Sequence, residues 1–308
     1  MSHPLTLAVS PHIHSRNSTR KIMLAVILAL LPTTVAGTII FGWRSLLVVG
    51  VTVASAVIFE LLFNLIAKKK QTVGDLSAVV TGLLLALNLP ANIPLWQCVV
   101  GALFAIVVVK CIFGGLGSNL VNPAITSRVF MLVAFGSMTK AAFPTGVDAT
   151  SSATPLATEE TESLVDLFLG NHGGAIGEVC ALALLVGGIF LLASRVITWH
   201  IPVTFIGTVF VASFFMEGMS LTAALAAILS GGLLIGAIFM ATDYVTSPAT
   251  PWGKIIFGIG CGLFTFLIRY FTNYPEGVSF AILLMNIITP FISNWTRRRV
   301  FGKVGKKA

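Results

Sequence analysis

Long apolar stretches separated by short polar ones dominate the chain. Most approach the ~20 residues that a helix needs to cross the hydrocarbon core of a bilayer. Because backbone polar groups in lipid must bond within their own segment, such stretches predict helices. Ten can be read, near residues 22–40, 46–66, 76–89, 95–113, 122–138, 178–195, 201–217, 222–241, 253–272 and 277–296.

The third and eighth stretches are related in sequence. Residues 82–96 read GLLLALNLPANIPLW, and residues 236–252 read GAIFMATDYVTSPATPW. Each begins as an apolar helix, breaks at polar residues, passes two prolines and ends at a Trp. With five stretches per half, a repeat would have opposite orientations in the membrane. We therefore expect an all-α polytopic membrane protein, with ten transmembrane helices forming two inverted five-helix repeats. The alternative is that the breaks are ordinary turns between helices.

Charge fixes the expected orientation. Hydrophobic residues make up 56% of the chain and charged residues 10%, against about a quarter charged in soluble domains. With the N-terminus inside, three of the 19 Lys and Arg residues fall outside (Arg44, Lys140 and Arg269) and the other 16 inside, which satisfies the positive-inside rule. Both termini are thus expected in the cytoplasm, with the chain in a bacterial inner membrane. Topology accounts for the net charge of +8, because the basic residues cluster on the inner side, where anionic membrane lipid also lies. No nucleic-acid partner is expected, because no basic stripe interleaved with aromatics occurs.

These features divide the chain into five parts. Residues 1–21 are a basic cytoplasmic tail that suits an uncleaved signal anchor. Residues 22–138 and 178–296 are the two five-helix repeats. The acidic segment 139–177 between them is an extracytoplasmic loop, and residues 297–308 are a basic cytoplasmic tail.

The extracytoplasmic loop contains the segment DATSSATP, which begins at Asp148. It resembles the pattern Asp-x-x-(Ser/Thr)-Gly-Ala-Thr of bacterial flavin transferases, with Ser152 where Gly is usual. In that pattern the last residue, here Thr154, receives FMN through a phosphoester bond. Asp148, Ser151, Ser152 and Ala153 would be recognised by the transferase, and the proline that follows disfavours a helix at the acceptor. The alternatives are a solvated Ser/Thr-rich loop and, at Asp148, an Asx turn.

Together with the ten stretches, this motif resembles the RnfD/NqrB family of membrane proteins. RnfD proteins belong to the Rnf ferredoxin:NAD oxidoreductase, and NqrB proteins belong to the sodium-translocating NADH:quinone reductase. The short tail before the first stretch is more similar to the Rnf type. The resemblance covers nearly the whole chain and includes Ser10-Pro11-His12, Asn119-x-x-Asn122-Pro123 and Ser152-Ala153-Thr154-Pro155-Leu156.

The resemblance implies a urea-transporter-like fold and covalent FMN on Thr154. It leaves open a second, non-covalent flavin such as riboflavin. The implied partners are a second FMN-bearing subunit, iron–sulfur membrane subunits, peripheral subunits that handle ferredoxin and NAD, and a flavin transferase. Electron transfer would drive Na⁺ or H⁺ transport, and the chain would be one subunit of a translocase-type oxidoreductase, without complete activity alone.

Three polar residues are candidates for an ion path, because ionisable groups within a membrane are functional candidates by default. Asp243 lies at the break in the eighth stretch among hydroxyl groups, which are oxygen ligands that suit a small cation. Asn88 lies at the matching break, and Glu60 lies within the second stretch. For Glu60 the alternative is a helix-packing hydrogen bond or an ion pair with a residue such as Lys110 or Arg128.

Other polar residues predict structural roles. Asp75 and Glu178 precede the third and sixth stretches, where a carboxylate meets the positive end of the helix dipole. His172 is expected to be solvated, and Gly231-Gly232 allows close helix contact or a helix break. The four cysteines show no metal-ligand spacing, so no metal site, iron–sulfur cluster or disulfide is expected.

Two functions of different classes fit this scaffold. The first is a flavin-bearing electron-transfer subunit of an ion-pumping complex. The second is a solute channel or secondary transporter with the same repeats. The loop motif favours the first, because a transporter has no reason to carry a flavin acceptor. A pure scaffold for partner subunits is a third alternative.

Overall fold

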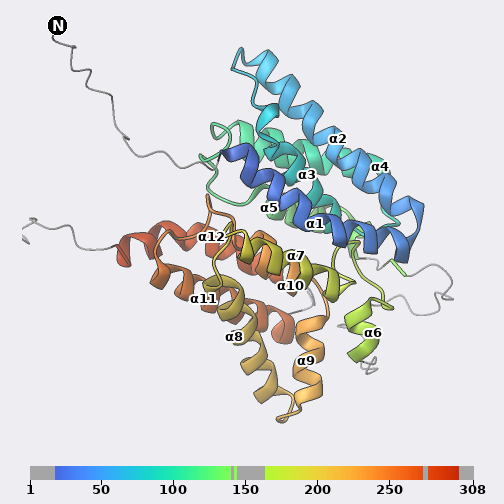
Figure 1. Ribbon diagram of the computed structural model, residues 1–308, viewed down its shortest axis with the longest axis vertical. Coiled ribbons are helices and arrows are strands. Elements are labelled where there is room, and N and C mark those ends of the chain that lie inside the picture. Colours follow the sequence, from blue (N-terminus) through green and yellow to red (C-terminus); the bar gives the residue numbers. More distant parts are fainter. Residues whose placement is uncertain (1–17, 140–141, 144–163, 273–276, 298–308) are drawn as a thin grey trace, which may run out of the picture.

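The structure is a computed structural model that describes residues 18–139, 142–143, 164–272 and 277–297. Within these residues the fold is built from helices (Figure 1). The protein is therefore a polytopic membrane protein, as predicted. Four helices are long and apolar enough to cross a membrane, namely α1 (Thr19–Phe41), α2 (Trp43–Ile66), α11 (Pro251–Phe271) and α12 (Val278–Trp295).

Shorter apolar helices and one bent pair account for the remaining stretches. In the bent pair, α9 (Leu221–Leu229) meets the helix formed by α10 (Leu233–Ile235) and η4 (Gly236–Met240) at 66°. The bend falls at Gly231, whose φ of 67° favours glycine, as the predicted break requires. The shorter helices are α3 (Ser77–Leu87), α4 (Leu95–Leu103) continued by η2 (Phe104–Cys111), α5 (Pro123–Ala134), α7 (Ala181–Ala193) and α8 (His200–Met216). Single turns are η1 (Val73–Asp75), η3 (Gly136–Thr139) and α6 (Leu164–Leu169).

The two halves of the chain form two blocks (Figure 1). Helices α1 to α5 make one block and α7 to α12 the other, and the blocks meet where α1 packs against α7 and α5 against α12. At the first contact the backbones touch closely, because a Cβ added at Gly187 would collide with the carbonyl oxygen of Ala29. Small residues allow such close approach between helices in membranes.

The helix ends carry the residues expected at a membrane surface. All five tryptophans are more than half exposed, and all lie at or next to a helix end. Trp is enriched at this level because its ring is apolar while its N–H reaches water. The five are Trp43, Trp96, Trp199, Trp252 and Trp295.

Two of the three basic residues predicted outside bind backbone carbonyls. Arg44 Nε donates to the Ala91 oxygen at 3.1 Å, and Arg269 Nη1 donates to the Ala227 oxygen at 2.6 Å. Ala227 lies in the last turn of α9, where carbonyl groups lack helical partners. These two arginines therefore supply hydrogen bonds to backbone carbonyl groups. This structural role is a reason for a basic residue at each position, even on the side where few basic residues are expected.

Candidate functional site

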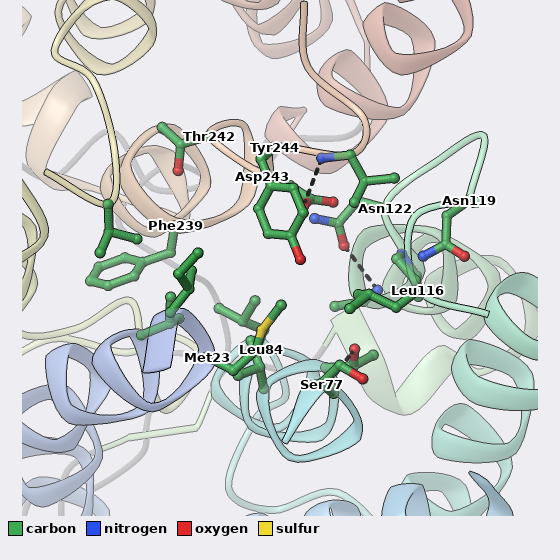
Figure 2. A pocket seen from close by; sticks show the side chains of 18 of the residues that line it. Met23, Ser77, Leu84, Leu116, Asn119, Asn122, Phe239, Thr242, Asp243 and Tyr244 are labelled. Carbon is green, nitrogen blue, oxygen red and sulfur yellow. Dashed lines mark hydrogen bonds between the residues drawn. The ribbon is translucent and has the colours of Figure 1, made fainter. Parts of the chain in front are cut away.

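A cavity of about 90 Å³ lies between the two blocks. Helices α1, α3 and α5 begin around it, whereas α7 and η4 end there, so it lies at one end of the helix bundle. Figure 2 shows Asp243, Tyr244 and Asn122 facing Ser77 and Leu84 across this space. The polar lining residues are Ser77, Thr81, Lys110, Asn119, Asn122, Thr242, Asp243 and Tyr244.

Asn122 holds the two blocks together at this cavity. Its Oδ1 accepts hydrogen bonds from the N–H groups of Ala124 (3.0 Å) and Ile125 (3.4 Å), so it caps α5, and Pro123 occupies the first helical position. Its Nδ2 donates to the carbonyl oxygen of Met240, the last residue of η4, at 3.2 Å. One side chain thus joins the start of a helix in the first block to the end of a helix in the second.

Asp243 lines the cavity from the loop after η4. Its carboxylate accepts hydrogen bonds from the Val245 N–H (3.3 Å) and the Thr246 hydroxyl (3.2 Å). Burial raises the pKa of this carboxyl above its ordinary value, and the two hydrogen bonds lower it by less. Asp243 is therefore a carboxylate on the cavity wall with one hydroxyl beside it.

Asn88 lies beside a buried ion pair rather than in the cavity lining. Arg128 of α5 donates from Nη1 to Asn88 Oδ1 at 2.6 Å and from Nη2 to Glu178 Oε1 at 2.7 Å. Asn88 Nδ2 in turn donates to the Leu84 carbonyl at 2.7 Å and contacts Met240 Sδ at 3.5 Å. Asn88 therefore contacts the last residue of η4, three residues before Asp243.

Glu60 forms an ion pair with Lys110, one of the two partners proposed for it from the sequence. The Lys110 Nζ lies 3.0 Å from Glu60 Oε1, and both side chains are buried. Lys110 also donates to the Ser77 hydroxyl at 2.6 Å, and Thr72 donates to Glu60 at 2.7 Å. Lys110 lies in η2, a π-helix, a feature common at functional sites. Glu60 thus reaches the cavity only through Lys110 and Ser77.

Glu178 has a larger role than the helix start predicted for it. It is 3% exposed and pairs with Arg128, which is 2% exposed. Gly232 provides the space, since a Cβ there would lie 2.5 Å from Glu178 Oε1 and 3.1 Å from Arg128 Nη1. A charge within apolar surroundings signals that it needs a partner, but it does not identify that partner. Asp75 does mark a helix start, because it accepts from the Ser77 N–H at 2.8 Å.

His172 is buried, so the expectation that it would be solvated is wrong. It is 3% exposed and lies between α6 and α7. Burial lowers the pKa of its imidazole, and a backbone hydrogen bond at Asp166 and the charge of Glu178 raise it by less. The segment between α6 and α7 is therefore packed into the protein, with residues 172–179 buried, even though it was predicted to be part of a polar loop.

The flavin motif lies outside the residues that the structure describes, and this includes Asp148, Ser151, Ser152, Ala153 and Thr154. For a second flavin, the cavity supplies amide, hydroxyl and carboxylate partners. Its volume of about 90 Å³ is nevertheless below the ~300 Å³ at which small-molecule sites begin. The cavity accommodates an ion or a few waters, and a flavin ring would require the lining to move.

Comparison with known proteins covers almost the whole chain. Residues 6–302 match the family described as NQR2, RnfD, RnfE. The D subunit of the Na⁺-translocating ferredoxin:NAD⁺ oxidoreductase complex of Acetobacterium woodii is 45% identical, over 99% of this chain and 98% of that protein. Its counterpart in the proton-translocating complex of Clostridium ljungdahlii is 39% identical, over 96% of each. The counterpart in the ion-translocating oxidoreductase complex of Stutzerimonas stutzeri is 39% identical, over 94% of this chain and 93% of that protein. The chain belongs to the NQR2, RnfD, RnfE family.

Proposed function

We propose that this chain is the subunit of an Rnf-type ion-translocating ferredoxin:NAD⁺ oxidoreductase that carries FMN covalently on Thr154. The observation that carries the proposal is the transferase-type motif from Asp148 to Thr154 in a chain whose full-length relatives are named as the D subunits of such complexes. When bound, FMN supplies the electron-transfer chemistry, and the protein supplies attachment and orientation. Thr154 holds the phosphate through its hydroxyl, and the other motif residues present that hydroxyl to a flavin transferase.

We further propose that the ten apolar stretches form two inverted five-helix repeats. A twofold axis relating the halves would bring equivalent helices together, and α1 packs against α7 and α5 against α12. The charge pattern favours an orientation with the termini and the cavity inside and segment 139–177 outside. Reporter fusions after Trp295 and within the 139–177 segment test this orientation, which requires opposite sides for the two reporters.

For ion coupling we propose that Asp243 is the residue in contact with the transported cation. It is a half-buried carboxylate on the wall of the cavity between the two blocks. Asn88 and Glu60 act less directly, since Arg128 and Lys110 hold them. Relatives of similar identity are named as Na⁺-translocating and as proton-translocating, so residues around the path, rather than family membership, would choose the ion.

The proposed partners are the remaining subunits of the complex. They comprise a second FMN-bearing subunit, iron–sulfur membrane subunits, and peripheral subunits for ferredoxin and NAD. A solute channel on the same scaffold is the competing function, and the cavity supports it as well as it supports ion coupling. The two differ in that only the electron carrier needs the flavin motif.

The experiment is an in-gel flavin assay of the chain co-expressed with its flavin transferase. We expect a band that fluoresces under ultraviolet light after denaturation, and loss of that fluorescence in Thr154→Ala. Thr158→Ala is the matched control, because it removes the same hydroxyl four residues later in the same loop and should keep the signal. A dark wild-type band would favour the channel.

A further inference from the structure

A groove of about 400 Å³ follows the surface of the second block between α7 and α8. Its lining is apolar throughout, with Leu185 and Leu192 from α7 and Ile206 and Phe210 from α8. Both helices are apolar segments of a membrane protein. The groove is therefore open to lipid or to a partner within the membrane, not to water.

Glycine keeps this groove open. A Cβ added at Gly207 would meet no atom within 4 Å, although the residue lies in the middle of α8. Gly188 of α7 also lines the groove, and a Cβ added there would be 3.0 Å from a methyl group of Ile238. A hydrocarbon chain in this space would gain dispersion contacts on several sides, which a flat helix surface does not offer.

One end of the groove is positively charged. The backbone N–H of Arg195 bonds to the carbonyl of Leu192, a lining residue, at 3.0 Å. Lys254 Nζ donates to the Thr198 hydroxyl at 3.1 Å, and Thr198 directly follows the lining residue Ile197. Both ion pairs found in the described part of the chain involve other residues. Neither Arg195 nor Lys254 therefore has a carboxylate partner there.

We propose that this groove binds one anionic phospholipid, with an acyl chain along α8 and the phosphate near Arg195 and Lys254. The basic end of the groove would bind the phosphate, and the apolar part would bind the acyl chain. These two parts follow each other in the groove as they do in the lipid, because the acyl chains begin next to the phosphate. The exposed ring of Trp199, stacked on His200 at 4.3 Å, marks the headgroup level beside it. The proposal is independent of the flavin on Thr154.

The test uses the assembled, purified complex, stripped of loose lipid and exposed to phosphatidylglycerol or phosphatidylcholine. Native mass spectrometry counts the phospholipids retained. We expect tighter retention of phosphatidylglycerol, and loss of one retained lipid in Gly207→Leu, which fills the groove. Gly50→Leu is the matched control, because Gly50 is an exposed helical glycine of α2 whose added Cβ also meets no atom within 4 Å. It should retain the lipid.

Charge variants test the headgroup contact separately. Arg195→Gln and Lys254→Gln should each weaken phosphatidylglycerol binding about fivefold and leave phosphatidylcholine binding unchanged. Lys70→Gln, which changes an exposed lysine on the loop after α2, should have no effect. Equal retention of the two lipids, or unchanged retention in Gly207→Leu, would overturn the proposal. Failure of Gly207→Leu alone to assemble with the other subunits would also overturn it, in favour of a partner helix in the groove.

Discussion

Arg128 and Glu178 form an ion pair of 2.7 Å that is almost fully buried. Arg128 lies in α5, and Glu178 lies just before α7, so the pair crosses from the first block to the start of the second. Asn88 accepts a further hydrogen bond from the same guanidinium group. A charge pair in this position links the two blocks.

Removing one charge of this pair should be costly. Arg128→Gln leaves Glu178 buried without its counter-charge, and the expected loss is about 3–5 kcal/mol of folding free energy. Denaturant unfolding in detergent measures it. The double variant Arg128→Met with Glu178→Leu should be more stable than either single charge removal, because no buried charge is left unpaired. Additive losses in the double variant would show that the two side chains do not interact.

Asn122 should lose stability in two separable steps. Asn122→Ser retains a cap for α5 but loses the bond to the Met240 carbonyl, at a cost of about 1 kcal/mol. Asn122→Ala also loses the cap, which adds about 1 kcal/mol. The same unfolding assay ranks the three proteins. Equal stability of the serine and alanine variants would contradict the capping role.

Asp243→Asn should uncouple ion transport from electron transfer. The variant retains the shape of the side chain but removes the negative charge that a cation needs, so we expect transport per electron to fall about tenfold, with flavin content unchanged. Burial raises the pKa of Asp243, so this carboxyl takes up a proton at a higher pH than an ordinary aspartate does. Because the protonated form lacks the charge that binds Na⁺, Na⁺ uptake by the wild-type protein should weaken in that higher pH range. Proteoliposomes report transport with a Na⁺-sensitive dye, and with a pH-sensitive dye where H⁺ is the transported ion. Glu217→Gln, at an exposed site bonded to Tyr270, serves as control, and an equal loss there would refute a specific role.

His172 should make the segment between α6 and α7 sensitive to acid. Its pKa is lowered by burial, so the unfolded segment binds a proton more readily than the folded one. Stability is therefore complete above the ordinary histidine value of about 6.5 and is lost as the pH falls below it. The hydrogen-exchange protection factors of residues 170–176, which correct for the pH dependence of intrinsic exchange, should fall between pH 7 and pH 5, and His172→Gln should remove this dependence. Identical pH profiles for the two proteins would contradict the prediction.

The sequence predicted the helices well because lipid imposes continuous apolar runs, so every predicted stretch coincides with a helix or with joined helices. Two helices begin where a capping residue precedes proline, at Asn122-Pro123 and Thr250-Pro251, which is a start signal present in the sequence. The partner of Glu178 was not readable, because Arg128 lies fifty residues away and an ion pair between separate helices has no local pattern. The bend at Gly231 was foreseeable, since a glycine pair permits the positive φ found there.

Packing decided the rest of the candidate site. Glu60, Asn88 and Asp243 were predicted together as one path, yet only Asp243 lines the cavity. Lys110 holds Glu60 and Arg128 holds Asn88, and both cations come from other helices. A polar residue within an apolar stretch was therefore a correct sign of a buried polar contact. Its hydrogen-bond partner could not be predicted, because that partner depends on how the helices pack.

The most direct measurement is the mass of the loop peptide that contains Thr154, taken from the complex isolated from its native membrane. We expect a peptide heavier by one FMN less one water, with fragment ions that place the added mass on Thr154. An unmodified peptide in a complex that transfers electrons would show that Thr154 does not carry covalent FMN.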